Sequence, residues 1–278
     1  IWEDSSITCV AIATPAVTHF ALAFQALSAG KHVLVEKPLT TSAPEASNLC
    51  DLADQENLVL MVDHLLLFHP ALQQLERSLE SGDLGTIYQI YSRRTNLGVI
   101  RSEENALWSL GAHDVAVMLR LVGEKPVRVI AEGGVYLQPL ENIQDVVFVT
   151  LAFPGGQIGH MHLSWHDPRK AREITVVGSK KMALFDDGEV SEKLRIYDMG
   201  VGISTDDLSF PIRNNGMKVV ATGSEEPLSL LCQHFLECVA RGQASLSSGR
   251  SGLEVVQVLE AAQASLDSLG TPVLLSER

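Results

Sequence analysis

The sequence contains few cysteines, and they follow no recognisable pattern. Its four cysteines, Cys9, Cys50, Cys232 and Cys238, are scattered along the chain, and no C-x-x-C pair occurs. This spacing argues against a disulfide framework or a thiolate metal site. We interpret the cysteines as buried free thiols and therefore expect a cytoplasmic protein.

The sequence also lacks segments that would direct it to a membrane or to nucleic acid. No apolar run approaches the roughly 20 residues that span a bilayer, and the first residues lack the basic and apolar regions of a signal peptide. The formal net charge of −13 argues against nucleic acid or an anionic membrane as the main partner. A small anionic substrate stays open, because local arginines can outweigh the global charge.

A G-x-G-x-x-G turn is missing near the N-terminus. Apolar runs at residues 7–14, 32–36 and 58–62 predict strands buried on both faces. Helical patterns separate them, and Ser42 with Glu45 predicts a capping box at the second helix. This order is half of a doubly wound parallel sheet. We therefore expect residues 1–64 to form a partial, N-terminally truncated Rossmann domain that lacks its first βα unit.

After residue 64 the pattern becomes rich in strands. Few crossover helices separate them, so we expect residues 65–278 to form an α+β substrate and oligomerisation domain with an open, largely antiparallel sheet backed by helices. The open face needs a cover, which predicts a homo-oligomer. The expected strands are 87–93, 127–137, 146–153, 157–165, 173–177 and 182–185, and the expected helices are 70–79, 107–121, 228–240 and 252–269.

The strand expected at residues 32–36 ends in Glu36-Lys37-Pro38, and its lysine is a reactive group. Ligands of open parallel sheets bind at the carboxyl ends of the strands, so Lys37 stands where a substrate would lie. A lysine there can orient a hydroxyl, stabilise an alkoxide, or act as a base if burial lowers its pKa. The alternative is a solvated lysine paired with Glu36; the strand-end position favours function.

Two further motifs accompany this turn: Thr14-Pro15 with His19 after the preceding strand, and His113-Asp114 in a later helix. Together the three motifs resemble the glucose–fructose oxidoreductase / inositol dehydrogenase / rhizopine catabolism (Gfo/Idh/MocA) family. The resemblance implies NAD- or NADP-dependent hydride transfer at a ring carbon of a sugar.

The same resemblance implies roles for individual residues. The cofactor-binding residues would be Thr14, Pro15 and His19 beside the nicotinamide, Glu36 at its ribose, and Lys37. Lys37 would also face the reacting carbon, and His113 would be its acid/base partner. Histidine suits proton exchange near neutral pH.

Other segments look most like family members that act on nucleotide-linked amino sugars or their uronates. These segments are Arg94-Thr-Asn96-Leu97-Gly98, Trp108 with His113-Asp114, Asp167-Pro168-Arg169-Lys170 and Val176-Val177-Gly178-Ser179. One position departs from the family pattern, because Ser109 stands where many members carry a carboxylate one helical turn before the histidine. With the missing first unit, Ser109 supports an alternative: a non-catalytic sugar-binding or assembly relative.

We expect arginine to bind an anionic substrate, because its guanidinium group can donate two parallel hydrogen bonds to a carboxylate or phosphate group. Strand alternation puts Arg94 and Asn96 on one face, and we group them with Asp114 as substrate-binding residues. Arg93 and Arg101 are interpreted as members of surface ion pairs.

The sheet histidines are interpreted as polar residues on the exposed face of the open sheet, where they could line the sugar pocket. His160 and His162 would point the same way in a strand, and His166 would share that face, as metal ligands do. No carboxylate or thiolate is spaced to join them, so we expect no metal. Asp63-His64 and His69 are interpreted as capping or packing residues.

Overall fold

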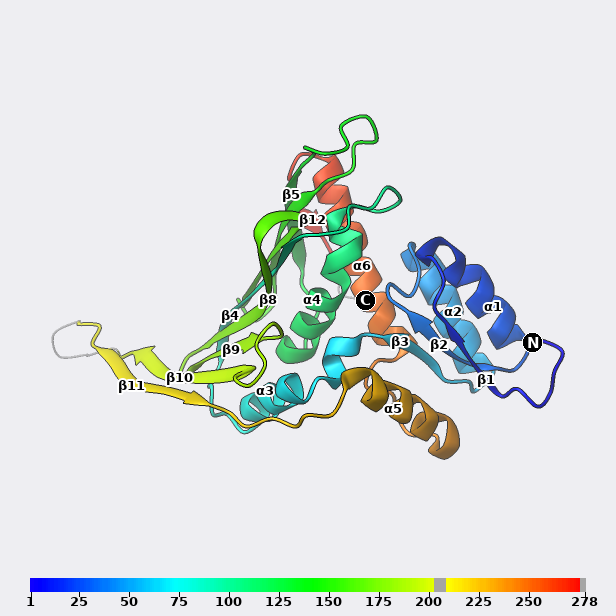
Figure 1. Ribbon diagram of the computed structural model, residues 1–278, viewed down its shortest axis with the longest axis horizontal. Coiled ribbons are helices and arrows are strands. Elements are labelled where there is room, and N and C mark those ends of the chain that lie inside the picture. The colour runs from blue at the N-terminus through cyan, green and yellow to red at the C-terminus, as the bar shows by residue number, and fades with distance from the viewer. Residues whose placement is uncertain (203–208, 276–278) are drawn as a thin grey trace.

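The computed structural model describes residues 1–202 and 209–275, and they form two sheets (Figure 1). The first sheet holds β1 (Cys9–Ile12), β2 (His32–Glu36) and β3 (Leu60–Asp63), all parallel and in the order β1-β2-β3. Its helical connections are η1 (Ala16–Thr18) with α1 (His19–Ser28), and α2 (Ala43–Gln55). The predicted partial Rossmann fold is confirmed.

The second sheet has nine strands in the order β11-β10-β9-β8-β4-β7-β6-β5-β12. All neighbours are antiparallel except β4 and β7, so the largely antiparallel sheet is confirmed. The strands are β4 (Ile87–Leu97), β5 (Arg128–Gly134), β6 (Val146–Ala152), β7 (Ile158–Ser164), β8 (His166–Gly178), β9 (Met182–Asp186), β10 (Leu194–Val201), β11 (Ile212–Val219) and β12 (Val273–Leu274). The last three were not predicted.

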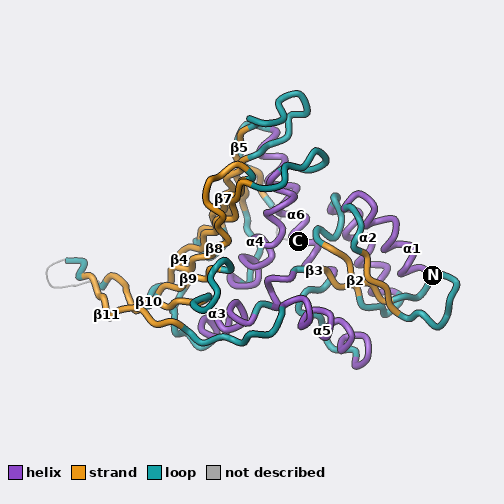
Figure 2. The backbone as a smooth tube through the Cα atoms, viewed as in Figure 1, coloured by secondary structure: helices purple, strands orange, loops and turns teal. Residues whose placement is uncertain are grey.

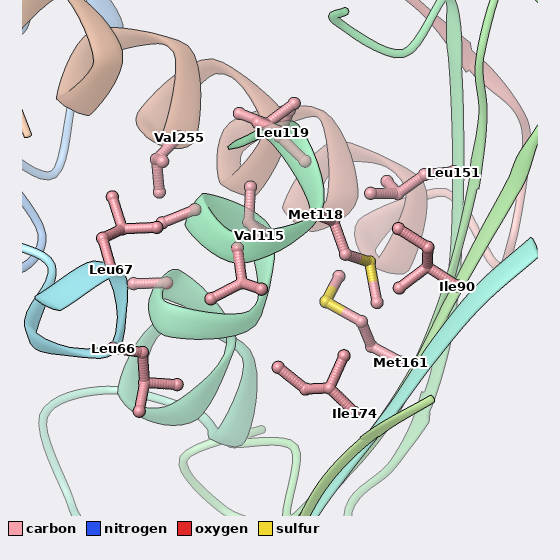
Figure 3. Close-up of a cluster of buried hydrophobic side chains, with 14 of the residues drawn as sticks. Leu66, Leu67, Ile90, Val115, Met118, Leu119, Leu151, Met161, Ile174 and Val255 are labelled. Carbon is pink, nitrogen blue, oxygen red and sulfur yellow. The ribbon is translucent and has the colours of Figure 1, made fainter. Parts of the chain in front are cut away.

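Helices gather on one side of this sheet (Figure 2). They are η2 (Leu65–Phe68), α3 (Pro70–Glu80), α4 (Ala106–Val122), α5 (Pro227–Arg241) and α6 (Gly249–Asp267). Met118 of α4 meets Ile90 and Met161 of the sheet, while the helix turns Val115 toward Leu67 (Figure 3). Helix α4 is therefore the central layer of the core, buried against the sheet on one side and against η2 and α6 on the other.

Burial alternates along the strands, as expected for a sheet packed on one face only. Within residues 1–202 and 209–275, no helix is both long and apolar enough to cross a membrane.

The ends of two helices show how well local signals predict structure. Helix α4 begins at Asn105, whose side chain accepts a hydrogen bond from the Trp108 amide, and ends at Gly123 with φ +77°. The capping box predicted at α2 is wrong, because the Ser42 side chain makes no capping bond. Instead, the Ala43 amide donates to the carboxylate of Glu260 in α6, at 2.9 Å. A distant helix thus supplies the cap.

Helix α6 also joins the two sheets. A Cβ atom added at Gly252 would lie 2.5 Å from Cγ2 of Val62 in β3. Glycine is therefore needed for the close approach of α6 to the parallel sheet.

We expect Gly252→Ala to destabilise the fold by about 1–3 kcal/mol, because the overpacking outweighs the gain in helix propensity. Urea denaturation measures the loss. Adding Val62→Ala creates room for the new methyl group, so the double variant should lose less stability than the sum of the two single variants. Simple additivity would show that this contact does not limit the packing.

Candidate active site

Two turns at the carboxyl ends of β1 and β2 build one wall of the site. The first holds Thr14-Pro15, and the second holds Glu36-Lys37-Pro38 with a cis Lys37-Pro38 peptide. His19, only 1% exposed, joins them: Nδ1 lies 2.8 Å from the Pro38 carbonyl oxygen and Nε2 lies 2.9 Å from that of Thr14. His19 therefore lies beneath the turns and fixes their spacing.

A cleft of about 920 Å³ opens beside these turns. Its lining includes Thr14, Pro15, Glu36 and Lys37, as the sequence suggested for cofactor-binding residues, whereas His19 is not part of it. The opposite wall is formed by residues 99–104 and Trp108. The position, outside the carboxyl ends of parallel strands, and the volume both suit a nicotinamide nucleotide.

Lys37 crosses from the first sheet to α4. Its Nζ donates a hydrogen bond to the backbone carbonyl of Ser109, at 2.8 Å. Burial lowers the pKa of this amine. The carboxylates of Glu104 and Glu36 oppose that shift, while the guanidinium groups of Arg101 and Arg94 add to it. Lys37 is thus an amine whose charged form is disfavoured, as a general base requires.

His113 lies one turn beyond Ser109 on α4, so Lys37 and His113 meet at the same stretch of helix. Burial, then the positive charges of Arg94 and Lys37, hold the pKa of His113 well below its ordinary value. Its imidazole is therefore neutral near pH 7. Its Nδ1 atom is buried without a hydrogen-bond partner.

Unpartnered polar atoms gather around Lys37. Eight buried side-chain nitrogen or oxygen atoms of the described residues have no hydrogen-bond partner, and four of them belong to Asp63, His64 and His113. Each of these three side chains interacts electrostatically with Lys37. Buried polar atoms without partners are rare and costly. Their concentration here marks the place where a polar ligand is needed.

Asp63 and His64 were interpreted from sequence as capping or packing residues. In the structure, burial shifts the pKa of each toward the neutral form, as it does for Lys37. Burial raises the pKa of Asp63 to about 6, with a further contribution from the Glu36 carboxylate. Burial lowers the pKa of His64 to about 4. The available signal was their position at the carboxyl end of a parallel strand, the same signal that singled out Lys37.

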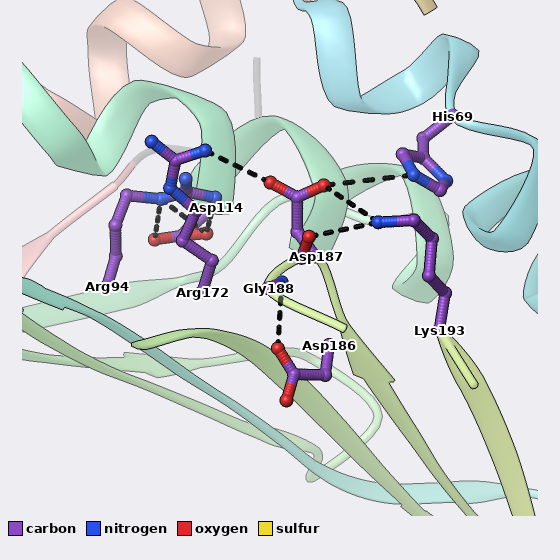
Figure 4. A network of polar contacts seen from close by, with 8 residues as sticks. All are labelled: His69, Arg94, Asp114, Arg172, Asp186, Asp187, Gly188 and Lys193. Atoms are coloured by element: carbon purple, nitrogen blue, oxygen red, sulfur yellow. Dashed lines mark hydrogen bonds and ion pairs between the residues drawn. The ribbon is translucent and has the colours of Figure 1, made fainter. Parts of the chain in front are cut away.

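The predicted substrate residues form a buried ion pair. The Arg94 guanidinium donates from Nη2 to Asp114 at 2.9 Å and from Nε at 3.1 Å (Figure 4). Two donors of Arg94 are thus committed to Asp114. Asn96 lies further along β4, half-buried.

Asp187, in the turn between β9 and β10, lies beside this pair and contacts two cationic side chains, Arg172 and Lys193, and the ring of His69, whose pKa is lowered by burial (Figure 4). Arg172 lies 3.3 Å away, and Lys193 and His69 lie 3.8 Å away. His69 also caps α3, since its Nδ1 accepts from the Ala71 amide at 3.0 Å, which confirms the capping interpretation.

The ion pairs expected of Arg93 and Arg101 are present. Arg93 contacts Asp167 at 3.2 Å, and Arg101 contacts Glu104 at 3.2 Å. Arg101 additionally lines the cleft, a placement that the sequence did not indicate.

The sheet histidines make local contacts. His160 lies 3.1 Å from the Thr150 hydroxyl, and His162 stacks on Phe148 with a centroid distance of 4.5 Å. Among the residues that the structure describes, no three metal-ligating side chains are grouped to hold an ion.

The raised pKa of Asp63 predicts a pH-dependent effect on stability. The native state retains a proton that the unfolded chain releases between pH 3.8, the ordinary pKa of the carboxyl group, and about pH 6, so the free energy of unfolding falls as pH rises through that window. Asp63→Asn removes this penalty. At about pH 7.5 the variant should be more stable by roughly 1–2 kcal/mol, and at about pH 4 nearly unchanged.

Urea denaturation at the two pH values measures both differences. Asp83→Asn removes a partly exposed carboxylate that contacts Lys181 and should stabilise at neither pH. An equal effect of Asp63→Asn at both values would contradict the assigned pKa shift.

Comparison with known proteins agrees with this arrangement. Residues 1–64 match the NAD-binding Rossmann-fold profile of the Gfo/Idh/MocA oxidoreductase family, and residues 72–184 match the C-terminal domain profile of the same family. UDP-N-acetylglucosamine 3-dehydrogenase from Acidithiobacillus ferrooxidans is 27% identical over 91% of this chain and 76% of its own. Its solved structure superposes with a TM-score of 0.81 over 94% of this chain and 79% of that one.

Two further solved structures share the architecture. One is an oxidoreductase from Magnetospirillum magnetotacticum, described as putative, that is 30% identical with a TM-score of 0.79 over 93% of this chain and 81% of its own. The other is an inositol dehydrogenase homolog from Azotobacter vinelandii, solved with NADH and myo-inositol, whose 21% identity and TM-score of 0.82 over 99% of this chain and 80% of that one show a common fold. The chain is therefore a member of the Gfo/Idh/MocA family, an NAD(P)-dependent oxidoreductase that acts on CH–OH groups of sugars.

Proposed function

We propose that this dehydrogenase transfers hydride between NAD(P) and a ring carbon of a nucleotide-linked amino sugar or uronate. The observation that carries the proposal is the desolvated amine of Lys37, which lines the cleft and has polar atoms without partners near it. The 27% identity to a UDP-N-acetylglucosamine 3-dehydrogenase across 91% of the chain supports the substrate class.

The residues of the two strand-end turns bind the cofactor. Thr14 and Pro15 bind beside the nicotinamide, Glu36 binds its ribose, and His19 holds the two turns at the correct spacing. NAD(P), when bound, supplies the acceptor or donor of the hydride.

Proton transfer falls to the chain's own residues. Lys37 takes the hydroxyl proton as the alcohol is oxidised, and the neutral imidazole of His113 accepts or donates a hydrogen bond at the same oxygen. Because many relatives place a carboxylate where this chain has Ser109, His113 here lacks a carboxylate one helical turn before it on α4.

We expect Lys37→Ala to lower kcat for oxidation of UDP-N-acetylglucosamine by about 10²- to 10⁴-fold, the usual contribution of a positioned base. The dissociation constant for NAD(P) should change little, because Nζ turns away from the first sheet toward α4. Steady-state kinetics and calorimetric titration, on the protein expressed from its complete natural gene, measure the two quantities.

Lys218→Ala serves as the control, since Lys218 is exposed on β11. A comparable loss of kcat in both variants would show that the effect is not specific to Lys37. Full activity of Lys37→Ala would show that Lys37 is not the base. The alternative, a relative that binds sugars without oxidising them, predicts no oxidation by the wild-type protein.

We also propose that Arg94, with Asn96 and Asp114 behind it, meets an anionic group of the substrate. Removing Arg94 alone would leave the Asp114 carboxylate buried and unpaired, which is strongly destabilising. The informative variant is therefore Arg94→Ala combined with Asp114→Asn. Its KM should rise about tenfold or more for the anionic UDP-N-acetylglucosamine and far less for neutral myo-inositol. Equal changes for both sugars would make the pair purely structural.

Two broader properties belong to the same proposal. A homo-oligomer would cover the open sheet face, where Tyr91 and Phe148 are 46% and 43% exposed. A cytoplasmic location agrees with four cysteines that are all free thiols, although only Cys50 and Cys238 are buried as predicted, while Cys9 is half-buried and Cys232 is exposed.

A further inference from the structure

Asp63, at the end of β3, lies beside the turn that carries Lys37 at the end of β2. Strands β2 and β3 are parallel neighbours, and Glu36 and Asp63 are partners in their register. Their side chains leave the sheet on the same face, and the two carboxyl groups are hydrogen-bonding neighbours. Two carboxyl groups this close hold one proton between them more readily than they hold two negative charges.

The Asp63 carboxyl group is built to exchange a proton and not merely to cap a chain end. The amide of Leu65 donates to it, yet its Oδ1 atom is buried without a partner. A capping carboxylate would have its oxygens satisfied by the backbone. The unpartnered oxygen and the positive charge of Lys37, which interacts with this carboxyl group, indicate a functional use.

The pair also has a route to solvent. Glu36 lines the cleft, while Asp63 itself is half-buried. The other charged or titratable groups around Lys37 and Asp63 offer no comparable acceptor. His64 and His113 have lowered pKa values and hold protons poorly, and Arg94 and Arg101 hold theirs permanently. Glu104 is committed to an ion pair with Arg101.

We propose that Asp63, paired with Glu36, receives from Lys37 the proton that Lys37 takes from the substrate hydroxyl. This inference rests on the proposed role of Lys37 as the base. During oxidation, the hydroxyl O–H bond breaks and its proton binds the neutral Lys37 amine. The carbon–hydrogen bond breaks with its electron pair leaving as hydride to NAD(P)⁺, and the C=O bond forms.

The Lys37 ammonium then gives one proton to the Asp63 carboxylate, which releases it to water through the cleft. The net products are the carbonyl compound, NAD(P)H and one proton, so atoms and charge balance. Asp63 acts through Lys37 and is in this sense a positioning residue.

The test compares wild type, Asp63→Asn and Asp83→Asn in the protein expressed from its complete natural gene. The Asp83 variant also removes a carboxylate that contacts a lysine, but far from the cleft, on the stretch before β4. Two quantities are measured: the pH dependence of kcat for UDP-N-acetylglucosamine oxidation, and the titration midpoint of the Lys37 amine in the ligand-free protein by ¹³Cε NMR of labelled lysine. The Lys37 resonance is assigned by its absence from Lys37→Ala.

Wild type should lose kcat below about pH 6, where Asp63 becomes protonated, and Asp63→Asn should lose that acid limb with kcat lowered about tenfold. The Lys37 midpoint should fall by about half a pH unit in Asp63→Asn, because a neighbouring negative charge is removed. Asp83→Asn should match wild type in both measurements.

An Asp63→Asn variant with the wild-type pH profile and an unchanged Lys37 midpoint would overturn the proposal. If the asparagine variant does not fold, Asp63→Glu takes its place: it keeps the carboxyl group, so retention of the acid limb supports the relay and its loss contradicts it. Failure of the base assignment itself is distinguishable, because Lys37→Ala would then remain active.

Discussion

The site depends on a single hydrogen bond across two structural layers, from Lys37 Nζ to the Ser109 carbonyl. Lys37 belongs to the parallel sheet and Ser109 to the central helix of the second domain. Two contacts hold the flanking parts in place: α6 packs closely on β3 through Gly252, and His19 bonds the turn that carries Lys37. Burial at this junction lowers the pKa of the amine, and the same burial leaves neighbouring polar atoms without partners.

The charges around this junction are arranged so that fixed ion pairs surround groups able to titrate. Arg94 is bound to Asp114 and Arg101 to Glu104, while Asp187 contacts Arg172 and Lys193. Paired groups keep their charge, so they shape the electrostatic field without exchanging protons. The titratable groups are Lys37, Asp63, His64 and His113, and each has its pKa shifted toward the neutral form by burial.

Much of this could be predicted from the sequence, where the signal is local. Buried strands, the glycine at the end of α4 and the Glu36-Lys37-Pro38 turn all follow from residues close together in the chain. The paired strands β10 and β11 were missed: only the first residues of β10 alternate in burial, and β11 is largely exposed. The predicted capping box at α2 was wrong: the Ser42 side chain makes no capping bond, and the amide of the first helical residue, Ala43, is bound by Glu260, 217 residues away.

In the candidate site, too, the features that depend on nearby residues could be predicted, whereas those that depend on distant contacts could not. The sequence placed Lys37 and Glu36 at a strand end, and the structure puts both in the cleft. It could not show that Arg94 is bound to Asp114 or that Asp63 lies beside Glu36, because these pairs depend on register and on packing between distant segments. Burial decides the ionisation of each group, and burial is a property of the whole fold.

The central claim is that Lys37 touches the hydroxyl that is oxidised. A crystal structure with oxidised cofactor and UDP-N-acetylglucosamine tests it most directly. The account predicts Lys37 Nζ within about 3 Å of the hydroxyl on the sugar carbon that faces the nicotinamide, with His113 at the same oxygen. A sugar bound elsewhere, with Lys37 still contacting only the Ser109 carbonyl, would contradict it.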